Sequence, residues 1–353
     1  MSEGMTYTKA GVDRERRANA KKALKLLNQT HKFSVYGEVL RLPYGCIFPV
    51  GDRYLDLAIE GVGTKVLLAQ LAEKYDTIGI DGVAMAVNDV IRSGAHPLAV
   101  ADNIHAQVSN PILVRQWMKG IAEAAIQSGC IVIGGEIGDV AEIIIGIKEG
   151  KGFDMVVACI GELHKDHIIL GTEVKPEDVI IGLRSSGIHS NGVTLARKVL
   201  FKHWGGRFNA YDRLDNMENE LIFEILKPTE IYSKPMEYVT ESYKVKGAVH
   251  ITGNAYLKFD RIMRFSKAVG FEFNNFTPQP IFNLLKDIGR ITDEEMFKTF
   301  NMGWGFALIV EKQDEDDVLD ALERIPIKAE VIGHATATKR IVVNHDRKKI
   351  VLK

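Results

Sequence analysis

Residues 53–75 read RYLDLAIEGVGTKVLLAQLAEKY, and this stretch decides how the N-terminal half folds. The alternation of side chains over 53–59 predicts a strand, and residues 66–75 have the pattern of a helix. Between them lies the turn Glu60-Gly61-Val62-Gly63-Thr64-Lys65. Glycines let backbone N–H groups approach an anion, and the start of the next helix adds partial positive charge. The stretch therefore predicts a strand–turn–helix unit that either binds an anion or forms a tight capped turn.

The C-terminal half contains a second unit of the same kind. A strand is predicted over 179–183 and a helix over 193–203, and between them residues 185–192 read SSGIHSNG. Hydroxyl groups, an amide and glycines at a helix start have the composition of a polar anion-binding loop. A capped loop without a ligand is the alternative, and a lone histidine such as His189 is more often structural.

Strands and helices alternate through both halves, which indicates an α/β (α+β) fold. The N-terminal half has predicted strands over 76–80, 97–101, 130–133 and 155–160, and predicted helices over 9–27, 81–93 and 111–125. The C-terminal half has predicted strands over 306–311, 330–333 and 341–343, and predicted helices over 218–226 and 315–325. A polar segment over 161–177 separates the two patterns. We therefore predict two domains, residues 1–170 and residues 171–353.

The composition is that of an ordinary globular protein. Its 353 residues exceed the ~250–300 that a single core usually serves, which also favours two domains. Lys and Arg number 45 against 46 Asp and Glu, and the net charge of −1 argues against a nucleic-acid partner. No apolar run approaches the ~20 residues of a membrane span, so no membrane partner is expected. Three separated cysteines favour a reducing, cytoplasmic location.

Three acids occupy positions that suit Mg²⁺. Glu60 follows the first strand, Asp89 lies inside an apolar predicted helix, and Glu136 follows a glycine pair after another strand. Carboxylate oxygens are the ligands that Mg²⁺ prefers, and a buried carboxylate is costly unless it is paired or bound to a cation. Three such acids are typical of a magnesium–nucleotide site, with pairing inside the protein as the alternative. Asp81, taken alone, is predicted to be the N-cap of the helix over 81–93.

Taken in their order and spacing, these motifs resemble the phosphoribosylformylglycinamidine cyclo-ligase (aminoimidazole ribonucleotide synthetase) family from about residue 7 to the C-terminus. The segments that carry the resemblance are AGVD (10–13), EGVGTK (60–65), DTIGIDGVAMAVND (76–89), GAHPL (94–98), SGC (128–130), GGE (134–136), SSGIHSNG (185–192), KPTEIY (227–232), HITG (250–253) and FNMGWGF (300–306). The resemblance implies an N-terminal four-stranded mixed sheet that pairs with its copy into a barrel in a homodimer, and a C-terminal α/β domain. It also implies a ligase of purine biosynthesis that uses ATP and Mg²⁺ to cyclise formylglycinamidine ribonucleotide.

The resemblance further implies roles for the matching residues. The residues implied to bind Mg²⁺ are Glu60, Asp89 and Glu136. Those implied to bind ATP are Lys25, Gly61, Gly63, Thr64, Lys65, Asp81 and Asn88. Those implied to bind the substrate are Ser186, Gly187, His189, Ser190, Asn191 and Thr252. The implied catalytic residues are His250, Lys65, Asp89 and His189, with His250 as the candidate for proton transfer.

The sequence departs from the family at three of these loops. Glu60 stands where the family usually has Asp, Ile137 stands where Thr usually follows Gly-Gly-Glu, and Asn254-Ala255 stand where further glycines usually follow HITG. Two alternatives therefore stay open beside the cyclo-ligase. One is another ATP-dependent enzyme of the same superfamily with a different substrate, and the other is a non-catalytic nucleotide-binding paralogue.

Overall fold

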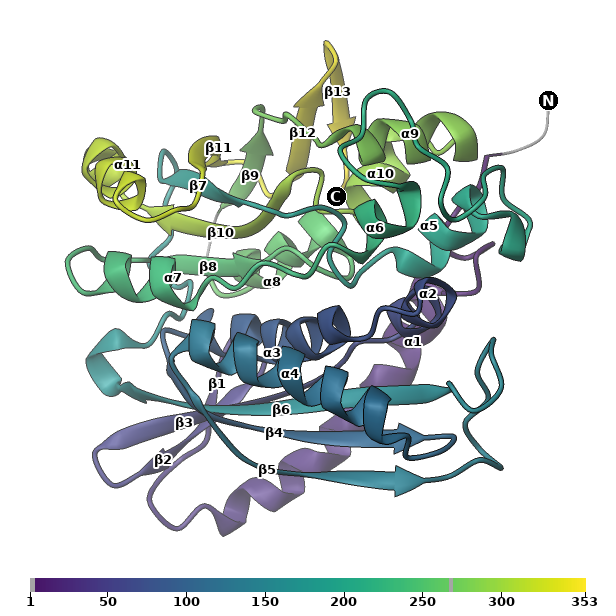
Figure 1. Cartoon of the computed structure of the whole chain (residues 1–353). Coiled ribbons are helices and arrows are strands. Elements are labelled where there is room, and N and C mark those ends of the chain that lie inside the picture. Colours follow the sequence, from purple (N-terminus) through teal and green to yellow (C-terminus); the bar gives the residue numbers. More distant parts are fainter. Residues whose placement is uncertain (1–3, 267–268) are drawn as a thin grey trace.

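Two mixed sheets organise the chain in the computed structural model, which describes residues 4–266 and 269–353 (Figure 1). Among these residues, the N-terminal half forms six strands in the order β1 (Leu40–Arg41), β2 (Cys46–Val50), β3 (Arg53–Gly61), β6 (Phe153–His164), β4 (His96–Ala106) and β5 (Ile131–Asp139). Neighbouring strands are antiparallel except for β4 and β5, which are parallel. The mixed sheet is confirmed, and it has two more strands than the resemblance implied because the short β1–β2 pair extends it.

Helices cover one face of this sheet. The helical segments of the N-terminal half are α1 (Arg14–Ala20), the 3₁₀ segment η1 (Lys21–Phe33), α2 (Lys65–Ala72), α3 (Asp76–Ile91), α4 (Pro111–Ser128) and the short η2 (Lys165–His167). Figure 1 shows α3 and α4 between the six-stranded sheet and the C-terminal half. Helix α3 packs on β3 and β6 and is buried along almost its whole length. This explains why its polar residues need partners inside the protein.

The start of α3 corrects one prediction. Residues 76–80 were expected to be a strand with Asp81 capping the next helix, but α3 runs without interruption from Asp76 to Ile91. The short apolar run over 78–80 fits a buried helix as well as a strand, so its pattern does not discriminate between them. The N-cap prediction for Asp81 is therefore wrong. Helix α4 has a side-chain cap, because the Asn110 side chain accepts a hydrogen bond from the backbone N–H of Ile112.

The C-terminal half is built on a second mixed sheet. Its described strands follow the order β13 (Lys348–Val351), β12 (Ile341–His345), β9 (Gly270–Phe273), β11 (Ala329–Thr336), β7 (Val179–Arg184), β10 (Trp304–Val310) and β8 (Gly247–His250). The helical segments are α5 (Val193–Leu200), η3 (Lys202–Trp204), α6 (Leu221–Leu226), α7 (Ser233–Thr240), η4 (Ala255–Lys258), α8 (Phe259–Met263), α9 (Pro280–Gly289), α10 (Asp293–Thr299), η5 (Lys312–Asp314) and α11 (Glu315–Glu323). Strands β7, β10 and β8 are buried along almost their whole length, with β8 at the edge of the sheet, and their loops face the N-terminal half.

Residues 4–14 lie on the C-terminal half, not beside β1. The backbone N–H of Tyr7 donates to Oε1 of Glu295 over 2.9 Å, and Arg14 pairs with the same carboxylate at 3.0 Å. The Lys198 ammonium donates to the carbonyl of Ala10 over 2.8 Å. The chain then crosses through α1 and η1 to reach β1. No helix in the described part of the chain is long and apolar enough to cross a membrane.

Candidate active site

The two predicted strand–turn–helix units meet at the junction of the halves. Strand β3 ends at Gly61, and helix α2 begins at Lys65 after Gly63, whose φ of 68° is one that glycine adopts without strain. The hydroxyl of Thr64 does not cap α2. It lies 2.8 Å from the hydroxyl of Thr194 in the first turn of α5. The two glycine-rich turns therefore start neighbouring helices whose N-termini share one junction.

Lys65 lies inside a closed cluster that we call the Lys65 cluster, which consists of Lys65, Asp81, Lys227 and Thr229. The Lys65 side chain has no exposed surface, and its ammonium contacts Asp81 at 2.8 Å and donates to the carbonyl of Lys227 over 2.7 Å. Asp81 also accepts hydrogen bonds from the backbone N–H and the hydroxyl of Thr229, at 2.8 and 2.7 Å. Burial lowers the pKa of Lys65, and Asp81 opposes that shift.

Further along α3, Asn88 also connects this helix to the C-terminal half. Its side-chain amide donates to the carbonyl of Glu230 over 2.8 Å and accepts from the backbone N–H of Tyr232 over 3.0 Å. Both polar atoms of this amide are thus bound to the KPTEIY segment. Asp81 and Asn88 together tie α3 to the C-terminal half, and their predicted contact with ATP stays a prediction.

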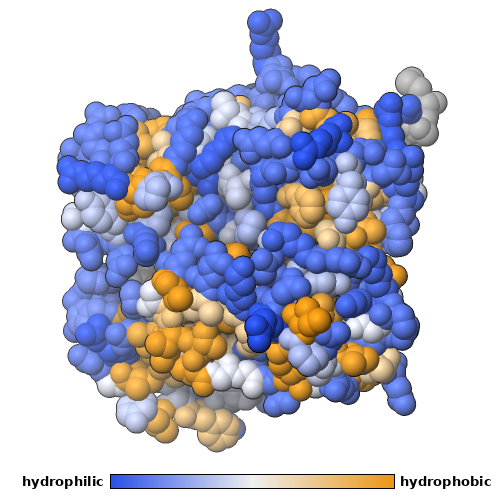
Figure 2. Space-filling model, in the orientation of Figure 1, coloured by the Kyte–Doolittle hydropathy of each residue, from blue (hydrophilic) through white to orange (hydrophobic). Residues whose placement is uncertain are grey.

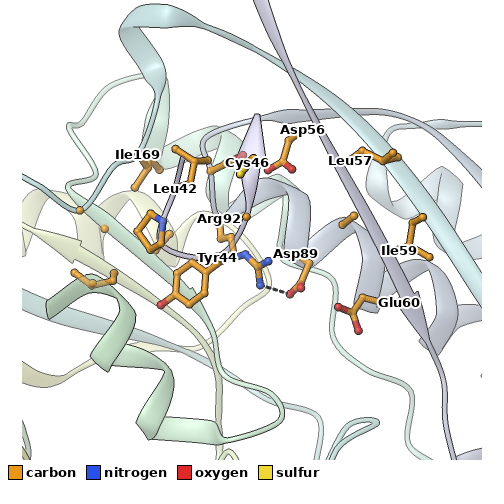
Figure 3. A pocket seen from close by; sticks show the side chains of 18 residues that line it. Leu42, Tyr44, Cys46, Asp56, Leu57, Ile59, Glu60, Asp89, Arg92 and Ile169 are labelled. Carbon is orange, nitrogen blue, oxygen red and sulfur yellow. Dashed lines mark ion pairs between the residues drawn. The ribbon is translucent and has the colours of Figure 1, made fainter. Parts of the chain in front are cut away.

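A second group of charged side chains lies around Asp89, the residue after Asn88. We call it the Asp89 cluster, and it consists of Glu60, Asp89, Arg92, His250 and Lys258. Asp89 contacts the guanidinium of Arg92 at 2.6 Å and Nδ1 of His250 at 2.8 Å. The ammonium of Lys258 donates to the carbonyl of His250 over 3.0 Å. Figure 3 shows the carboxylates of Glu60 and Asp89 side by side, with Arg92 joined to Asp89. Two halves of the chain therefore contribute to one charged group.

The charges in the Asp89 cluster are unevenly compensated. Burial and the neighbouring charge of Asp89 raise the pKa of Glu60 to about 7. Burial alone would raise the pKa of Asp89, but Arg92, Lys258 and His250 hold it well below its ordinary value. Burial lowers the pKa of His250 to about 4 and that of Lys258 to about 8. At neutral pH the cluster thus holds a firm carboxylate, a second acid close to half-ionised and an uncharged imidazole.

A cavity of about 200 Å³ adjoins this cluster. Glu60, Asp89 and Arg92 line it, together with Tyr44, which is placed by the loop between β1 and β2 (Figure 3). The Arg92 guanidinium lies 4.7 Å from the centre of the Tyr44 ring, and the Tyr44 hydroxyl donates to the carbonyl of Lys258 over 3.2 Å. The cavity is therefore polar on one side and is closed by contacts between the two halves.

The SSGIHSNG loop places His189 in a single tautomer. This side chain is buried at a φ of 60°, and its Nε2 accepts from the backbone N–H groups of Ser186 and Glu230, at 3.3 and 3.4 Å. A nitrogen that accepts carries no proton, so the proton of the neutral ring is on Nδ1, which has no partner among the described residues. Burial holds the pKa of His189 well below its ordinary value.

The remaining loop residues predicted to bind substrate lie near His189 but have protein partners. Ser190 shares a hydrogen bond of 3.2 Å with Thr229, and Ser186 donates to the carbonyl of Pro228. The carbonyl of Gly187 accepts from Asn301 over 2.8 Å. Gly253 lies against the amide of Asn191. The predicted substrate residues are thus brought to one region, and their contact with a substrate stays a prediction.

Gly305 shows why the FNMGWGF segment needs its second glycine. A Cβ at this position would lie 2.1 Å from the hydroxyl oxygen of Tyr232 and 2.5 Å from Cε1 of His189. The next residue, Phe306, pairs across the sheet with His250. Gly305 therefore leaves the space that His189 and Tyr232 occupy.

Glu136 and Lys25 are not brought to the Asp89 cluster within one chain. Glu136 lies inside β5, not after a strand, and is exposed on this edge strand. Glu60, Val157, Asp102 and Gly135 are in register across the sheet, so Glu136, one residue further, points to the face opposite α3. No group of three or more His, Cys, Asp or Glu residues suited to a metal ion occurs among residues 4–266 and 269–353. Lys25 is exposed on η1.

Four residues of this region were missed by the sequence analysis: Tyr44, Arg92, Asp102 and Lys258. Asp102 is buried, has a carboxylate oxygen without a partner among the described residues, and lies where a Cβ on Gly135 would come within 2.4 Å of it. The glycine pair before Glu136 thus makes room for this carboxylate. Arg92 could have been found from its place one turn after Asp89, since i,i+3 positions share a helix face. Lys258 and Tyr44 carry no such local signal.

Known proteins resemble the chain over nearly its whole length. Residues 44–163 match the N-terminal domain, and residues 175–346 the C-terminal domain, of the family described as AIR synthase related protein. The phosphoribosylformylglycinamidine cyclo-ligase of Methanocaldococcus jannaschii is 37% identical over 352 residues, covering 99% of this chain and 97% of that protein. That of Pyrococcus horikoshii is 37% identical over 326 residues, covering 91% and 92%. The structure of AaThiL complexed with AMPPCP and TMP shares the fold, with a TM-score of 0.63 at 14% identity, covering 99% and 97%.

Proposed function

The chain belongs to the phosphoribosylformylglycinamidine cyclo-ligase family, and from that premise we propose that it converts formylglycinamidine ribonucleotide and ATP into aminoimidazole ribonucleotide, ADP and phosphate. The observation that carries the proposal is the Asp89 cluster beside both glycine-rich turns, within a chain related to named cyclo-ligases from end to end. The reaction belongs to purine biosynthesis.

The chemistry needs an activated oxygen. An amide oxygen leaves poorly, so the γ-phosphoryl group first moves from ATP to the formyl oxygen: the bond between this phosphorus and the oxygen of the departing ADP breaks, and a new P–O bond to the formyl oxygen forms. The amidine nitrogen then attacks the formyl carbon, the C–O bond breaks, phosphate departs and the nitrogen loses a proton. The protein's contribution is to position the reactants and to offset the charge that develops. His189, fixed as an Nδ1–H donor, suits binding of an oxygen, whereas the free Nε2 of His250 suits acceptance of a proton.

The donor set of the Asp89 cluster fits Mg²⁺. Mg²⁺ commonly takes one or two carboxylates together with phosphate oxygens and water, and Glu60 and Asp89 are adjacent carboxylates beside a polar cavity. We propose that these two residues hold the metal, which would offset phosphate charge when bound. The orphaned carboxylate of Asp102 lies across the sheet from Glu60 and is a further candidate.

We propose that ATP binds at the Gly61–Thr64 turn. The backbone N–H groups there precede the start of α2, which favours negative charge. AaThiL, which shares this fold, was solved with AMPPCP, an ATP analogue. Lys25 is exposed on η1, and its contact with ATP remains part of the proposal.

A homodimer is the proposed assembly. The face of the six-stranded sheet opposite α3 exposes Leu57 and Ile59, which are 52% and 61% exposed, and the edge strand β5 adds Ile131 and Ile133. Figure 2 shows hydrophobic side chains at the surface of the half that contains this sheet. Apolar patches of this kind mark interaction sites, and a second copy would cover them. Glu136 points to this face. Sedimentation of a monomer at working concentration would contradict this assembly.

One experiment tests the proposed reaction. The purified protein is incubated with ATP, Mg²⁺ and formylglycinamidine ribonucleotide, and both ADP and aminoimidazole ribonucleotide are measured. Equal amounts of the two products are expected. ADP without the imidazole would favour another substrate, and ATP binding without ADP would favour a non-catalytic paralogue. A cytoplasmic location is proposed with the reaction, because Cys46, Cys130 and Cys159 are all free thiols.

A further inference from the structure

The proposed reaction needs a protein cation near the transferred phosphoryl group, and the sequence offered Lys65 for it. Phosphoryl transfer is accelerated by cations that offset charge on the phosphoryl oxygens. An ammonium has three N–H groups to donate. Lys65 already contacts Asp81 and the carbonyl of Lys227, and its side chain has no exposed surface. A phosphate would have to break a buried ion pair to reach it, which is costly.

Lys258 is placed differently. It lies at the end of η4, five residues after Gly253 of the HITG segment, and is only partly buried. Its ammonium donates to the carbonyl of His250 over 3.0 Å and to the hydroxyl of Thr252. These two contacts use two of its three N–H groups. Its nearby charges are Asp89 and Glu60, which attract it, and Arg92 and Arg261, which repel it.

The other cations of this region are more firmly committed. Arg92 is bound to Asp89 at 2.6 Å and lies over the ring of Tyr44. Arg261 lies over the same ring at 5.4 Å. Lys258 instead contacts neutral groups, and among the described residues no carboxylate is in direct contact with its ammonium.

The backbone before Lys258 is bent to put it there. Asn254 and Ala255 have φ values of 72° and 38°, which non-glycine residues rarely adopt. This turn reverses the chain after Gly253 and brings Lys258 back over the carbonyl of His250. Strain of this sort persists where the surrounding structure enforces it and is concentrated at functional sites.

We propose that Lys258, in place of Lys65, is the protein ammonium that stabilises the phosphoryl group during its transfer to the formyl oxygen. The inference rests on the proposed function. It makes Lys258 a charge-supplying residue of the Asp89 cluster and gives Lys65 a role in holding α2 and α3 to the C-terminal half.

Three substitutions at one position test this inference. Lys258→Gln retains N–H donors but removes the charge, Lys258→Arg retains the charge, and Lys258→Met removes both. We expect Lys258→Gln and Lys258→Met to lower kcat by about 100-fold or more while the KM for ATP changes by less than about three-fold. Lys258→Arg should recover at least about a tenth of the wild-type kcat, which a purely structural donor would not explain.

The matched control is Lys65→Met. Its thermal unfolding midpoint should fall well below that of the Lys258 variants, as expected when a buried ion pair loses one partner. A Lys258→Gln variant with a wild-type kcat would overturn the inference, as would a Lys258→Arg variant no better than Lys258→Met. If the wild-type chain makes ADP but no aminoimidazole ribonucleotide, or makes no ADP, the proposed function fails independently of these variants.

Discussion

The Lys65 cluster and the Asp89 cluster both join α3 to the C-terminal half, yet their charges are compensated in opposite ways. In the Lys65 cluster one ammonium meets one carboxylate, the carbonyl of Lys227 also binds the ammonium, and the backbone N–H and hydroxyl of Thr229 also donate to the carboxylate. In the Asp89 cluster two adjacent carboxylates compete, and the pKa of Glu60 rises to about 7. The Asp89 cluster also adjoins a cavity, whereas the Lys65 side chain is sealed from solvent.

The difference teaches that the position of a charge in a motif does not decide its role. Lys65 ends the motif that most resembles a phosphate-binding loop. In the structure its ammonium instead connects α2 to Asp81 of α3 and to the carbonyl of Lys227. Lys258 belongs to no recognised motif, and it lies where charge is unbalanced. A cluster whose charges are paired inside the protein, such as the Lys65 cluster, contributes to stability and specificity. A cluster with perturbed pKa values beside a cavity, such as the Asp89 cluster, can be stabilised by a ligand of opposite charge.

The largest expected effect comes from removing the carboxylate of the Lys65 cluster. Asp81→Asn leaves the Lys65 ammonium buried without its carboxylate, and we expect the free energy of unfolding to fall by about 3–5 kcal/mol. Urea denaturation measures it. The double variant Lys65→Met/Asp81→Asn should recover part of that loss, because the buried charge is gone. A loss below about 1 kcal/mol for Asp81→Asn would contradict the closed cluster.

The next largest effect concerns the Asp89 cluster. Asp89→Asn keeps the size of the side chain but removes the firm carboxylate that faces Arg92 and His250. We expect kcat/KM to fall by at least about 100-fold, which corresponds to about 2.7 kcal/mol of transition-state stabilisation. Steady-state kinetics at saturating Mg²⁺ measures it. Asp166→Asn, at an exposed acid outside both clusters, is the control and should leave kcat/KM unchanged.

A smaller effect appears in the pH dependence of stability. In metal-free protein the pKa of Glu60 is raised from 4.5 to about 7, so the unfolded chain loses this proton at lower pH than the folded chain. Stability from this group is therefore full below about pH 4.5 and falls as the pH rises toward 7. Glu60→Gln removes that fall, and at pH 8 we expect it to be more stable than wild type by about 1 kcal/mol. The free energy of unfolding of wild type and of Glu60→Gln is measured at pH 5 and pH 8 in samples treated with a chelator. If the change in this free energy between the two pH values is the same in both proteins, the prediction is refuted.

The smallest effect tests the turn that carries Lys258. Ala255 is fully buried at a φ of 38°, so Ala255→Gly relieves backbone strain but loosens the unfolded chain and removes a buried methyl group. We expect the free energy of unfolding to rise by no more than about 1 kcal/mol, with a lower kcat because Lys258 is held less firmly. Thermal unfolding and turnover are measured on the same sample. Lower stability with unchanged kcat would mean that the turn serves packing alone.

The sequence predicted local elements well and partners poorly. The strand before Gly61, the strand before the SSGIHSNG loop and the cap at Asn110 all follow from nearby residues, and the structure has them. The start of α3 does not, because an apolar run such as 78–80 suits a buried helix and a strand equally. The β5 strand continues through the glycine pair because β4 supplies its hydrogen bonds.

The site was predictable in part for the same reason. Asp89 and His250 were identified from local motifs, and the structure brings them within 2.8 Å. The partner of Lys65 comes from α3 and from residues 227–229, far along the sequence, so nothing near Lys65 reveals that it is neutralised. The position of Lys258 depends on a turn with positive φ at Asn254 and Ala255, and neither residue is the glycine that would indicate such a turn in the sequence. Glu136 was predicted from its neighbours, but its direction depends on its register with β4.

The docking of the first residues on the C-terminal half has a consequence for biosynthesis. Tyr7 is synthesised before its partner Glu295, which is made 288 residues later. Synthesis at ~5–20 residues per second separates the two by ~15–60 seconds, during which the six-stranded sheet can form while residues 4–14 have nowhere to dock. Residues 4–14 are therefore made well before the surface on which they dock.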